Sequence, residues 1–319
     1  MSEGEESLRS LKSLESLRSL EERGAFSHAV ITAGPVQDDA VELYDRWLDR
    51  GDSGTLDYMS RWRDVRNDPR LLIPAEEGGP ARSIIICLFA YPHHVVLGEP
   101  DGIAAYAHAS TDYHYALKAV LAPVAAAIDS DYGSVSRVVT DSAPLRERYW
   151  AARAGLGVIR RNNQLYVPGY GANFHIATIV TTAAMPEART LPPLALGHVC
   201  PDNCRLCVDA CPTGALRPDG TIDCRLCLSC ITIENARGEQ PDVPRAGAVF
   251  GCDACRLACP YTRTSRPAPV IDALRPNNAL AAVDWQTITG GQFRRLFGST
   301  ALARAGLKGI RNNISKIQN

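Results

Sequence analysis

The 319-residue sequence lacks any long hydrophobic run and carries almost no net charge. Its longest uninterrupted apolar stretch runs from Ile84 to Tyr91, whereas a membrane-spanning helix needs about 20 residues. A formal net charge of −1 excludes global electrostatic steering towards nucleic acid or an anionic membrane. The N-terminus shows neither an apolar signal core nor a twin-arginine pair, so we expect a cytoplasmic protein without a membrane partner.

Basic residues are unevenly distributed along the chain. The region 261–319 holds nine Lys and Arg residues against two Asp residues, so its local net charge is +7 and the remainder carries −8. This pattern fits either a surface that attracts a polyanion or a set of solvated helix faces, and both alternatives stay open. At roughly 150 residues per domain, the length predicts about two domains.

Cysteine, in contrast, is concentrated in one segment that holds ten of the eleven thiols. The segment contains three runs with short spacings: Cys200, Cys204, Cys207 and Cys211, then Cys224, Cys227 and Cys230, then Cys252, Cys255 and Cys259. The first and third runs each end in Cys-Pro. This arrangement resembles bacterial ferredoxins, in which three closely spaced thiolates hold one cluster and the cysteine before proline ligates the other.

The cysteine pattern therefore predicts two 4Fe-4S clusters. Zinc knuckles also use Cys-x2-Cys pairs, but they require neither a third closely spaced cysteine nor a proline after the last one. A disulfide framework is disfavoured because nothing marks the chain as secreted. Two four-iron clusters use eight thiolates, so two of the ten cysteines have no predicted role as ligands.

Spacing assigns one cluster but not the other. The crossed ferredoxin rule gives the first cluster to Cys200, Cys204, Cys207 and Cys259. The second takes Cys211 and three of the five remaining thiols, which are Cys224, Cys227, Cys230, Cys252 and Cys255. The compact triplet 224, 227 and 230 has the favoured spacing, but choosing it would leave Cys252 and Cys255 unused.

The first half of the chain alternates predicted strands and helices. The continuous apolar run 83–91 predicts a strand that is buried on both faces, with Cys87 as a core residue. Further strands are predicted over 136–140 and 175–182, and helices over 111–129, 145–154 and most of 25–68. This alternation favours an α/β layer, and the proline-rich stretch 186–193 marks its end.

The first 24 residues have a different pattern. Leucine recurs at every third position between Leu8 and Leu20, and this spacing rotates each leucine by about 300° around a helix. The leucines therefore do not form one apolar stripe. We expect residues 1–24 to be a weakly helical or disordered leader with no chemical role.

Two short stretches are candidates for a site in the α/β layer. Asp141 follows a predicted strand, where sheets of this class present ligands, but it is also a good helix cap. The segment 106–114 gathers polar aromatic residues and two histidines before a predicted helix. A single histidine of this kind is more often structural than functional.

Taken together, the motifs resemble the epoxyqueuosine reductase family over roughly residues 80 to 315. The resemblance is carried by Asp-Tyr-His at 112–114, Asp-Ser-Ala-Pro-Leu-Arg-Glu-Arg at 141–148, Trp-Ala-Ala-Arg-Ala-Gly-Leu-Gly at 150–157, Cys-Leu-Ser-Cys-Ile-Thr-Ile-Glu at 227–234 and Gly-Cys-Asp-Ala-Cys at 251–255. It implies an α/β (α+β) fold with a nitroreductase-like cobalamin-binding domain over 25–195. A ferredoxin-like domain with two 4Fe-4S clusters would follow over 196–264, and a basic helical extension over 265–319.

The resemblance also implies a reaction. Epoxyqueuosine in tRNA would be reduced to queuosine by two electrons that pass through two 4Fe-4S clusters to cobalamin, with Asp141 as the proton donor. The implied cobalamin contacts are Tyr106, Tyr113, His114, Ser142, Arg148, Gly155, Gly157 and Asn162. The implied partners are tRNA and an external low-potential electron donor of the flavodoxin or ferredoxin type, and the enzyme is expected to be a monomer.

The family pattern completes the second ligand set. Its ligand is the cysteine before Leu-Ser-x-x-Thr-Ile-Glu, which here is Cys227. The resemblance therefore implies a second cluster held by Cys211, Cys227, Cys252 and Cys255. It leaves Cys224 and Cys230 without a role.

Some positions depart from the family. Thr111 stands where the family has Arg, and Val158, Arg160 and Arg161 replace a Trp-containing and Lys-containing segment, which we expect to shape the substrate side of the pocket. The helical-repeat end that the family uses for tRNA does not follow residue 319 in this sequence. Two other functions stay open, a cobalamin-dependent reductase of a small molecule and a non-catalytic carrier of electrons.

Overall fold

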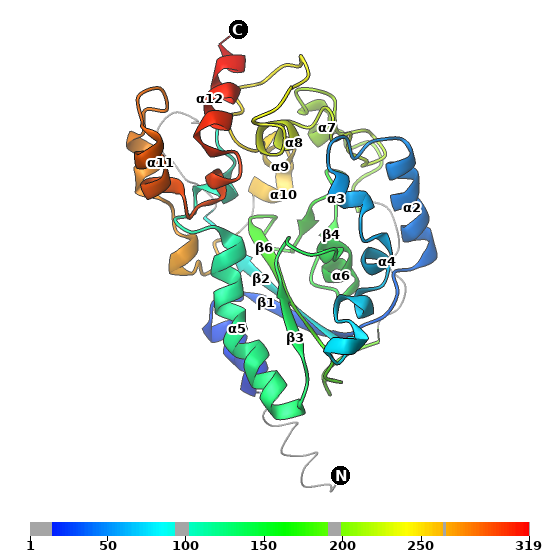
Figure 1. Ribbon diagram of the computed structural model, residues 1–319. Coiled ribbons are helices and arrows are strands. Elements are labelled where there is room, and N and C mark those ends of the chain that lie inside the picture. Colours follow the sequence, from blue (N-terminus) through cyan, green and yellow to red (C-terminus); the bar gives the residue numbers. More distant parts are fainter. Residues whose placement is uncertain (1–14, 93–101, 191–198, 264–265, 319) are drawn as a thin grey trace, which may run out of the picture.

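The computed structural model describes residues 15–92, 102–190, 199–263 and 266–318. Its centre is a four-stranded sheet with the order β1-β2-β6-β3 (Figure 1). The strands are β1 (Ser27–Thr32), β2 (Ser83–Ala90), β3 (Ser136–Val139) and β6 (Phe174–Thr181). A separate two-stranded sheet pairs β4 (Val158–Ile159) with β5 (Leu165–Tyr166). The α/β class expected from the sequence is confirmed.

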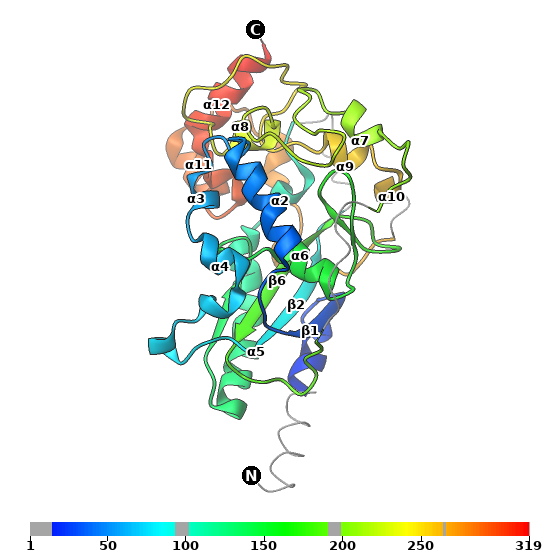
Figure 2. The same ribbon diagram turned by 90° about the vertical axis from the view of Figure 1, so that its right-hand side faces the viewer.

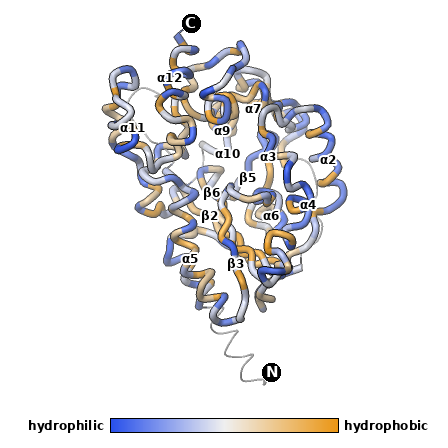
Figure 3. The backbone as a smooth tube through the Cα atoms, viewed as in Figure 1, coloured by the Kyte–Doolittle hydropathy of each residue, from blue (hydrophilic) through white to orange (hydrophobic). Residues whose placement is uncertain are grey.

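Strand β2 is buried along its whole length, as its continuous apolar run predicts. Alternate side chains of a strand point to opposite faces of the sheet. Ile85, Cys87 and Phe89 accordingly pack in the core beneath α5, whereas Ile84, Ile86 and Leu88 pack in the core beneath α6. Cys87 is fully buried, which confirms its prediction as a core residue. Figure 3 shows hydrophobic residues concentrated along this sheet and hydrophilic residues along α2.

Helices cover both faces of the sheet (Figures 1 and 2). In the first half of the chain they are α2 (Asp38–Asp49), α3 (Asp57–Ser60), α4 (Arg63–Asn67), α5 (Tyr113–Tyr132) and α6 (Glu147–Arg153), with short 3-10 helices η1 (Pro69–Leu72), η2 (Ala75–Glu77) and η3 (Ala105–His108). Helix α5 continues through Pro123. The described part of the chain contains no helix that is both long and apolar enough to cross a bilayer.

The prediction that residues 25–68 are largely helical is wrong for its first part, because Ser27–Thr32 form strand β1. The six residues are too few to show a clear alternating pattern. They become a strand by pairing with β2, antiparallel from Ser27 opposite Leu88 to Thr32 opposite Ser83.

Every pairing in the four-stranded sheet is antiparallel. The rule that parallel sheets bind ligands at the carboxyl ends of their strands therefore does not explain the position of Asp141. The pairing register of β3 and β6 explains the position of Asp141 instead. Val139 of β3 pairs with Thr178 of β6, so the chain beyond Val139 continues towards the His175 end of β6.

Part of the expected leader is packed on the sheet. Residues 15–22 are helical, and Leu17 and Leu20 are buried in the same core as α5. The leucines before Glu15 lie outside the described residues. The stretch 15–22 thus contributes to the core although its leucine spacing forms no continuous stripe.

The cysteine segment forms short helices and turns above the sheet, and the C-terminal helices lie beside it (Figures 1 and 2). Its helices are α7 (Leu206–Asp209), α8 (Leu228–Ile233), α9 (Ala254–Leu257) and α10 (Pro260–Arg263). They are followed by η4 (Asp272–Leu274), η5 (Asn278–Ala282), α11 (Gly290–Phe297), η6 (Ala301–Ala303) and α12 (Gly306–Ile317).

The C-terminal region has a core of its own that includes residues of the cysteine segment. Phe293, Phe297 and Ile310 pack with Phe250 and Ala236. Buried Asn313 of α12 donates hydrogen bonds to the carbonyl oxygens of Thr232 and Val249, both at 2.8 Å. These contacts tie α12 to the cysteine segment, so this region is not merely a solvated tail.

Candidate active site and thiol groups

Asp141 lies on the loop between β3 and α6, and its side chain is exposed. Its backbone has φ of +49°, a left-handed conformation that costs a non-glycine residue on the order of 1 kcal/mol. Helix α6 begins after Arg146, so the alternative prediction that Asp141 caps this helix is wrong. The hydroxyl of Tyr113 donates a hydrogen bond to Asp141 Oδ2 at 2.8 Å. The backbone N–H of Asp141 donates to both carboxylate oxygens of Glu147, at 3.0 and 3.1 Å.

Tyr113 is held in position by a stack of rings. Its ring lies 4.2 Å from that of His175 and 4.0 Å from that of His114, and the edge of Tyr106 meets it at 5.9 Å. Burial, followed by the charge of Asp141, raises the pKa of the Tyr113 phenol far above its usual value. Tyr113 therefore stays protonated and acts as a fixed donor to Asp141.

The pKa values of the two histidines in this stack are shifted in opposite directions. Burial disfavours the charged form of His114, but its 2.6 Å contact with Asp112 outweighs burial, and the pKa of His114 is raised. Burial lowers the pKa of His175 to about 3, so its imidazole is neutral. His175 Nε2 is buried and has no hydrogen-bond partner among the described residues. Buried polar atoms are usually hydrogen-bonded, so this nitrogen is available to a group outside the described residues.

Residues from distant elements surround Asp141. Tyr58 of α3 has a raised pKa because of burial and then the charges of Glu234 and Asp141. Arg304, which follows η6, forms a 2.6 Å ion pair with Glu234 and is also influenced by Tyr58 and Asp141. The rim of the site thus combines α3, α8 and the C-terminal region. Sequence reasoning missed four participants, which are Tyr58, Glu147, His175 and Arg304.

The eight residues named as cofactor contacts separate into two groups. Tyr106, Tyr113, His114 and Arg148 share contacts or electrostatic interactions with Asp141, and exposed Ser142 follows it in the loop. The structure does not bring Gly157 and Asn162 to this group. A Cβ at Gly157 would lie 2.5 Å from the carbonyl oxygen of Tyr166, so this glycine permits close packing on β5. Gly155 has φ of +76° after α6, and a Cβ added there would meet no described atom within 4 Å.

Asn162 instead connects the small sheet to the cysteine segment. Its side-chain amide is buried and donates to the hydroxyl of Tyr166 at 2.9 Å and to the carbonyl oxygen of Cys255 at 3.1 Å. On the other side of the segment, Asp253 accepts the backbone N–H of Ala105 at 2.8 Å. The segment that holds the thiols is therefore bonded directly to elements around the Asp141 site.

Four thiols line one cavity near the surface. They are Cys200, Cys204, Cys207 and Cys259. Burial raises the pKa of Cys207, and the charges of Cys200, Cys204 and Cys259 add to this effect. We call this set the first thiol group. Large apolar side chains beside it are exposed, namely Val199, Leu206, Leu257 and Tyr261.

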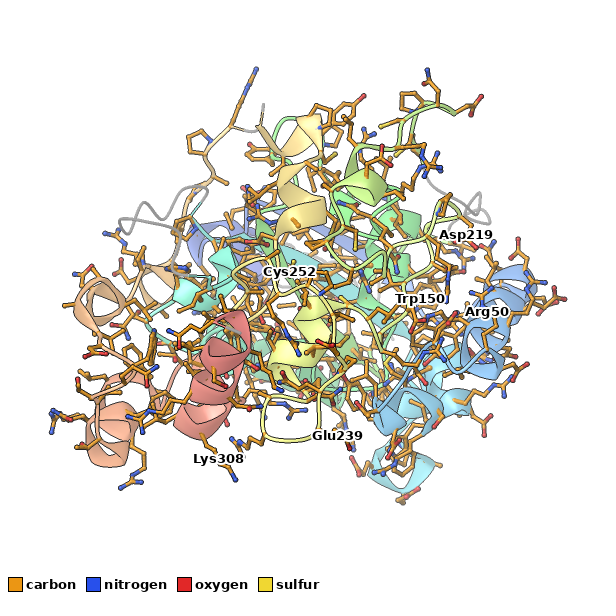
Figure 4. The ribbon with its side chains drawn as sticks, turned by 90° about the horizontal axis from the view of Figure 1, so that it is seen from above. Arg50, Trp150, Asp219, Glu239, Cys252 and Lys308 are labelled. Carbon is orange, nitrogen blue, oxygen red and sulfur yellow. The ribbon has the colours of Figure 1, made fainter. Side chains whose placement is uncertain are left out.

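A second set of thiols lies beside the first. Burial and then the charges of Cys252, Cys227 and Cys211 raise the pKa of Cys255 to about 12. Cys207 of the first thiol group also acts on Cys255, so the two sets are neighbours. We call Cys211, Cys227, Cys252 and Cys255 the second thiol group. In the view from above, Figure 4 shows Cys252 near the centre of the picture and Lys308 near its edge.

Cys227 has the surroundings of a thiolate. It precedes α8, and its pKa is lowered by a hydrogen bond from Cys230 and by the backbone N–H groups of Cys230 and Ser229. Cys224 contacts Cys230, and the thiols that act most strongly on Cys252 and Cys255 include Cys227 and Cys211. Among the described residues, no set of three or more His, Cys, Asp or Glu side chains is arranged to hold a single metal ion.

The prediction that Arg160 and Arg161 shape the substrate side of the Asp141 pocket is wrong, because both line the cavity of the first thiol group. The guanidinium of Arg160 lies 3.4 Å from the ring centroid of Tyr261, and the backbone N–H of Arg161 donates to Cys200 Sγ at 3.4 Å. Val158 packs against Cys259. Thr111 donates its backbone N–H to the carbonyl oxygen of Ala273.

Comparisons with known proteins agree with this arrangement. A family model described as a 4Fe-4S double cluster binding domain matches residues 200–262. Proteins named epoxyqueuosine reductase from Leadbetterella byssophila and Cyclobacterium marinum are each 32% identical to this chain. The first alignment covers 92% of this chain and 94% of the relative, and the second covers 92% and 93%.

Solved structures share the fold. A crystal structure of epoxyqueuosine reductase with an epoxyqueuosine-modified tRNA-Tyr stem loop has a TM-score of 0.76 and 24% identity, covering 95% of this chain and 80% of the other. A Bacillus subtilis epoxyqueuosine reductase, with its catalytic aspartate loop swung out of the active site, has a TM-score of 0.70 and 25% identity. It covers the same shares of the two chains.

Proposed function

The chain belongs to the epoxyqueuosine reductase family and is an oxidoreductase, and on this premise we propose that it reduces epoxyqueuosine in tRNA to queuosine. The observation that carries the proposal is the hydrogen bond from Tyr113 to Asp141 near the cysteine segment, since Asp141 and Cys230 both act on Tyr58. An acid held in this way next to an electron-transfer segment suits a reduction that also consumes protons. The relatives' names and the tRNA stem loop in one related structure support the substrate.

We propose that the first thiol group holds one 4Fe-4S cluster and the second thiol group the other. The donor sets fit, because each contains four cysteines. Four thiolates are the usual ligands of such a cluster. When bound, the clusters supply one-electron transfer between a donor and the Asp141 site.

Cobalamin is proposed as the cofactor at the Asp141 site. Its fit is supported by the buried Nε2 of His175, which has no hydrogen-bond partner among the residues that the structure describes. The residues that would hold it are Tyr106, Tyr113, His114, Ser142 and Arg148. Gly157 and Asn162 would support the walls of the site, since they contact Tyr166 and Cys255. When bound, cobalamin supplies a strongly reducing and nucleophilic metal centre.

The protein's own residues would manage the protons. Removal of an epoxide oxygen as water requires two electrons and two protons, and Asp141 would donate one proton to the departing oxygen. Tyr113 orients Asp141 through its bond to Oδ2, and the stacked rings fix the tyrosine. The exposed loop of Asp141 corresponds in this proposal to the movable aspartate loop of the Bacillus subtilis structure.

Electrons would enter at the first thiol group. Exposed Val199, Leu206, Leu257 and Tyr261 surround this group, and Arg160 stacks on Tyr261. Apolar side chains with an arginine among them suit a small acidic donor of the flavodoxin or ferredoxin type. We further propose that the enzyme acts as a cytoplasmic monomer, where a reducing environment preserves free thiols.

The proposed division of the chain is a cobalamin domain over 25–195, a two-cluster domain over 196–264 and a C-terminal extension over 265–319. Buried Leu17 and Leu20 extend the first domain into the expected leader. The shared core of Phe297 and Phe250 ties the third domain to the second.

The decisive test supplies the anaerobically reduced, cobalamin-loaded protein with epoxyqueuosine-containing tRNA and, separately, with the free nucleoside. Queuosine formed in the tRNA supports the proposal. Turnover of the nucleoside alone would indicate a reductase of small molecules. Absence of corrin absorbance together with intact iron–sulfur absorbance would identify a carrier of electrons, and would overturn the proposal.

A further inference from the structure

We propose that Glu147 is a positioning residue that holds the Asp141 loop in its reactive place by accepting the backbone N–H of Asp141. The inference rests on the proposed function, since it takes Asp141 as the proton donor. Glu147 does not itself touch the substrate. It acts through the position of Asp141.

The contact is specific in its geometry. Glu147 is the first residue of α6, and its carboxylate reaches back six residues to the N–H of Asp141, at 3.0 Å from Oε1 and 3.1 Å from Oε2. Both oxygens therefore share one donor. The residue before α6, Arg146, makes no capping hydrogen bond through its side chain. A glutamate in the first turn ordinarily benefits the helix itself, but here its carboxylate is directed to the loop.

The loop needs such a restraint. Asp141 has a left-handed backbone that is unfavourable for its residue type, and both Asp141 and Ser142 are exposed. The other hydrogen bond to Asp141, from Tyr113, holds only the side chain. Glu147 fixes the backbone, so the two contacts together determine where the carboxylate points.

The hold of Glu147 on the loop also depends on whether its carboxyl group is protonated. Burial, and then the charge of Asp141, raise the pKa of Glu147 to about 8. The charged groups that act on it are Asp141 from the loop and Arg148 from its own helix. Beyond them, Tyr113 of α5 binds Asp141, and Cys224 of the cysteine segment acts on Arg148.

The sign of the pH effect follows from this raised pKa. Below pH 8 the neutral carboxyl accepts the Asp141 N–H through its carbonyl oxygen and does not repel the Asp141 carboxylate. Above pH 8 ionised Glu147 is a stronger acceptor, but its burial and its repulsion of Asp141 oppose the closed loop. The loop should therefore loosen, and turnover should fall, as pH rises through about 8.

Hydrogen–deuterium exchange at pH 7 tests the contact without any need for turnover. In the cluster-loaded protein, Glu147→Ala should speed hydrogen exchange in the loop 140–146 by about tenfold, because the free energy of one lost hydrogen bond corresponds to a rate change of about that size. Glu147→Gln keeps a carbonyl acceptor at the same place, so its loop should exchange within about twofold of the native rate. Glu77→Ala is the control, because Glu77 pairs with Arg137 of β3 on the surface.

Activity gives a second and separable result. Glu147→Ala should lower kcat with little change in KM, and Glu147→Gln should restore kcat and abolish the loss of turnover above pH 8. Native exchange in the loop of Glu147→Ala would overturn the inference, as would an unchanged alkaline loss in Glu147→Gln. If no variant turns over but loop exchange changes as expected, the positioning role stands and the proposed function fails. Iron content verifies that each variant is folded, and if Glu147→Ala does not fold, Glu147→Gln decides alone.

Discussion

The thiol groups and the Asp141 site are assembled in different ways. The first thiol group takes three of its four cysteines from Cys200–Cys207, around the single turn of α7. The Asp141 site takes its members from η3, α5, the loop after β3 and the start of β6. Short-range spacing therefore determines the first thiol group except for Cys259, whereas the Asp141 site depends on the pairing of distant strands.

The difference has a consequence for mutation. A thiol has no substitute within its group, so its loss should remove a whole cluster. Asp141 is held by two separate contacts, one with Tyr113 and one with Glu147. Removing either contact alone should therefore reduce turnover only in part. Substitutions of the cysteines in the thiol groups should therefore remove a cluster, whereas substitutions at the Asp141 site should leave the iron content unchanged.

Loss of a thiol from the second group should be the most damaging change. Cys255→Ser should lower the iron content from about eight to about four per chain, because one four-iron cluster is lost. Turnover should then be undetectable, since electrons no longer reach the Asp141 site. Iron analysis and the iron–sulfur absorbance measure this effect. An iron content of about eight in this variant would contradict the assignment of Cys255.

Asp141→Ala should remove turnover while leaving the cofactors in place. General acids contribute about 10²- to 10⁴-fold to rates, so kcat should fall within that range. Iron content and corrin absorbance should match those of the native protein, because Asp141 is not among the proposed cluster ligands or cobalamin contacts. Native kcat in this variant would refute the role of Asp141 as proton donor.

Tyr113→Phe should have a smaller effect. It removes the 2.8 Å hydrogen bond to Asp141 but keeps the ring stack with His175 and His114. A hydrogen bond to a charged group contributes about 1.5–3 kcal/mol, so kcat should fall by roughly 10- to 100-fold. Steady-state kinetics of the variant beside Asp141→Ala provide the measurement, and an equal loss in both would mean that Tyr113 does more than orient the acid.

Asp52→Asn should weaken the fold and leave the chemistry intact. Fully buried Asp52 accepts hydrogen bonds from Arg217, at 2.7 and 2.8 Å, and from Arg50 at 2.8 Å, which lower its pKa to about 2. This lowered pKa contributes about 2 kcal/mol of stability that is present above about pH 4 and is lost as pH falls towards about 2. Denaturant unfolding at pH 7 and pH 2 should show a large difference between the two proteins at pH 7 and a much smaller one at pH 2.

The smallest effects are expected at the two cysteines outside the thiol groups. Cys224→Ser and Cys230→Ser should each retain about eight irons per chain, the content of two four-iron clusters. Cys230 contacts both Cys224 and Cys227, whereas the thiols that act most strongly on Cys252 and Cys255 include Cys227 and Cys211. Cys255→Ser is the matched comparison. A marked loss of iron in either variant would reassign the ligands of the second thiol group.

Much of the fold could be predicted because the relevant patterns are local. The apolar run 83–91 corresponds to β2, and the helix predicted over 111–129 corresponds to α5. Strand β1 was missed because an edge strand of six residues is stabilised by its partner rather than by its own pattern. The positions of Arg160 and Arg161 were misjudged because they depend on how β4 packs against the cysteine segment.

By itself, the sequence determined the two-cluster segment and singled out Asp141 as a candidate, because thiol spacing and a continuous motif are properties of neighbouring residues. Only the tertiary structure decided which contacts hold Asp141. Tyr113 and Asp141 are 28 positions apart, and His175 comes from another strand, so no local pattern brings them together. The antiparallel register of β3 and β6 does so, because strand pairing fixes which distant side chains share one end of the sheet.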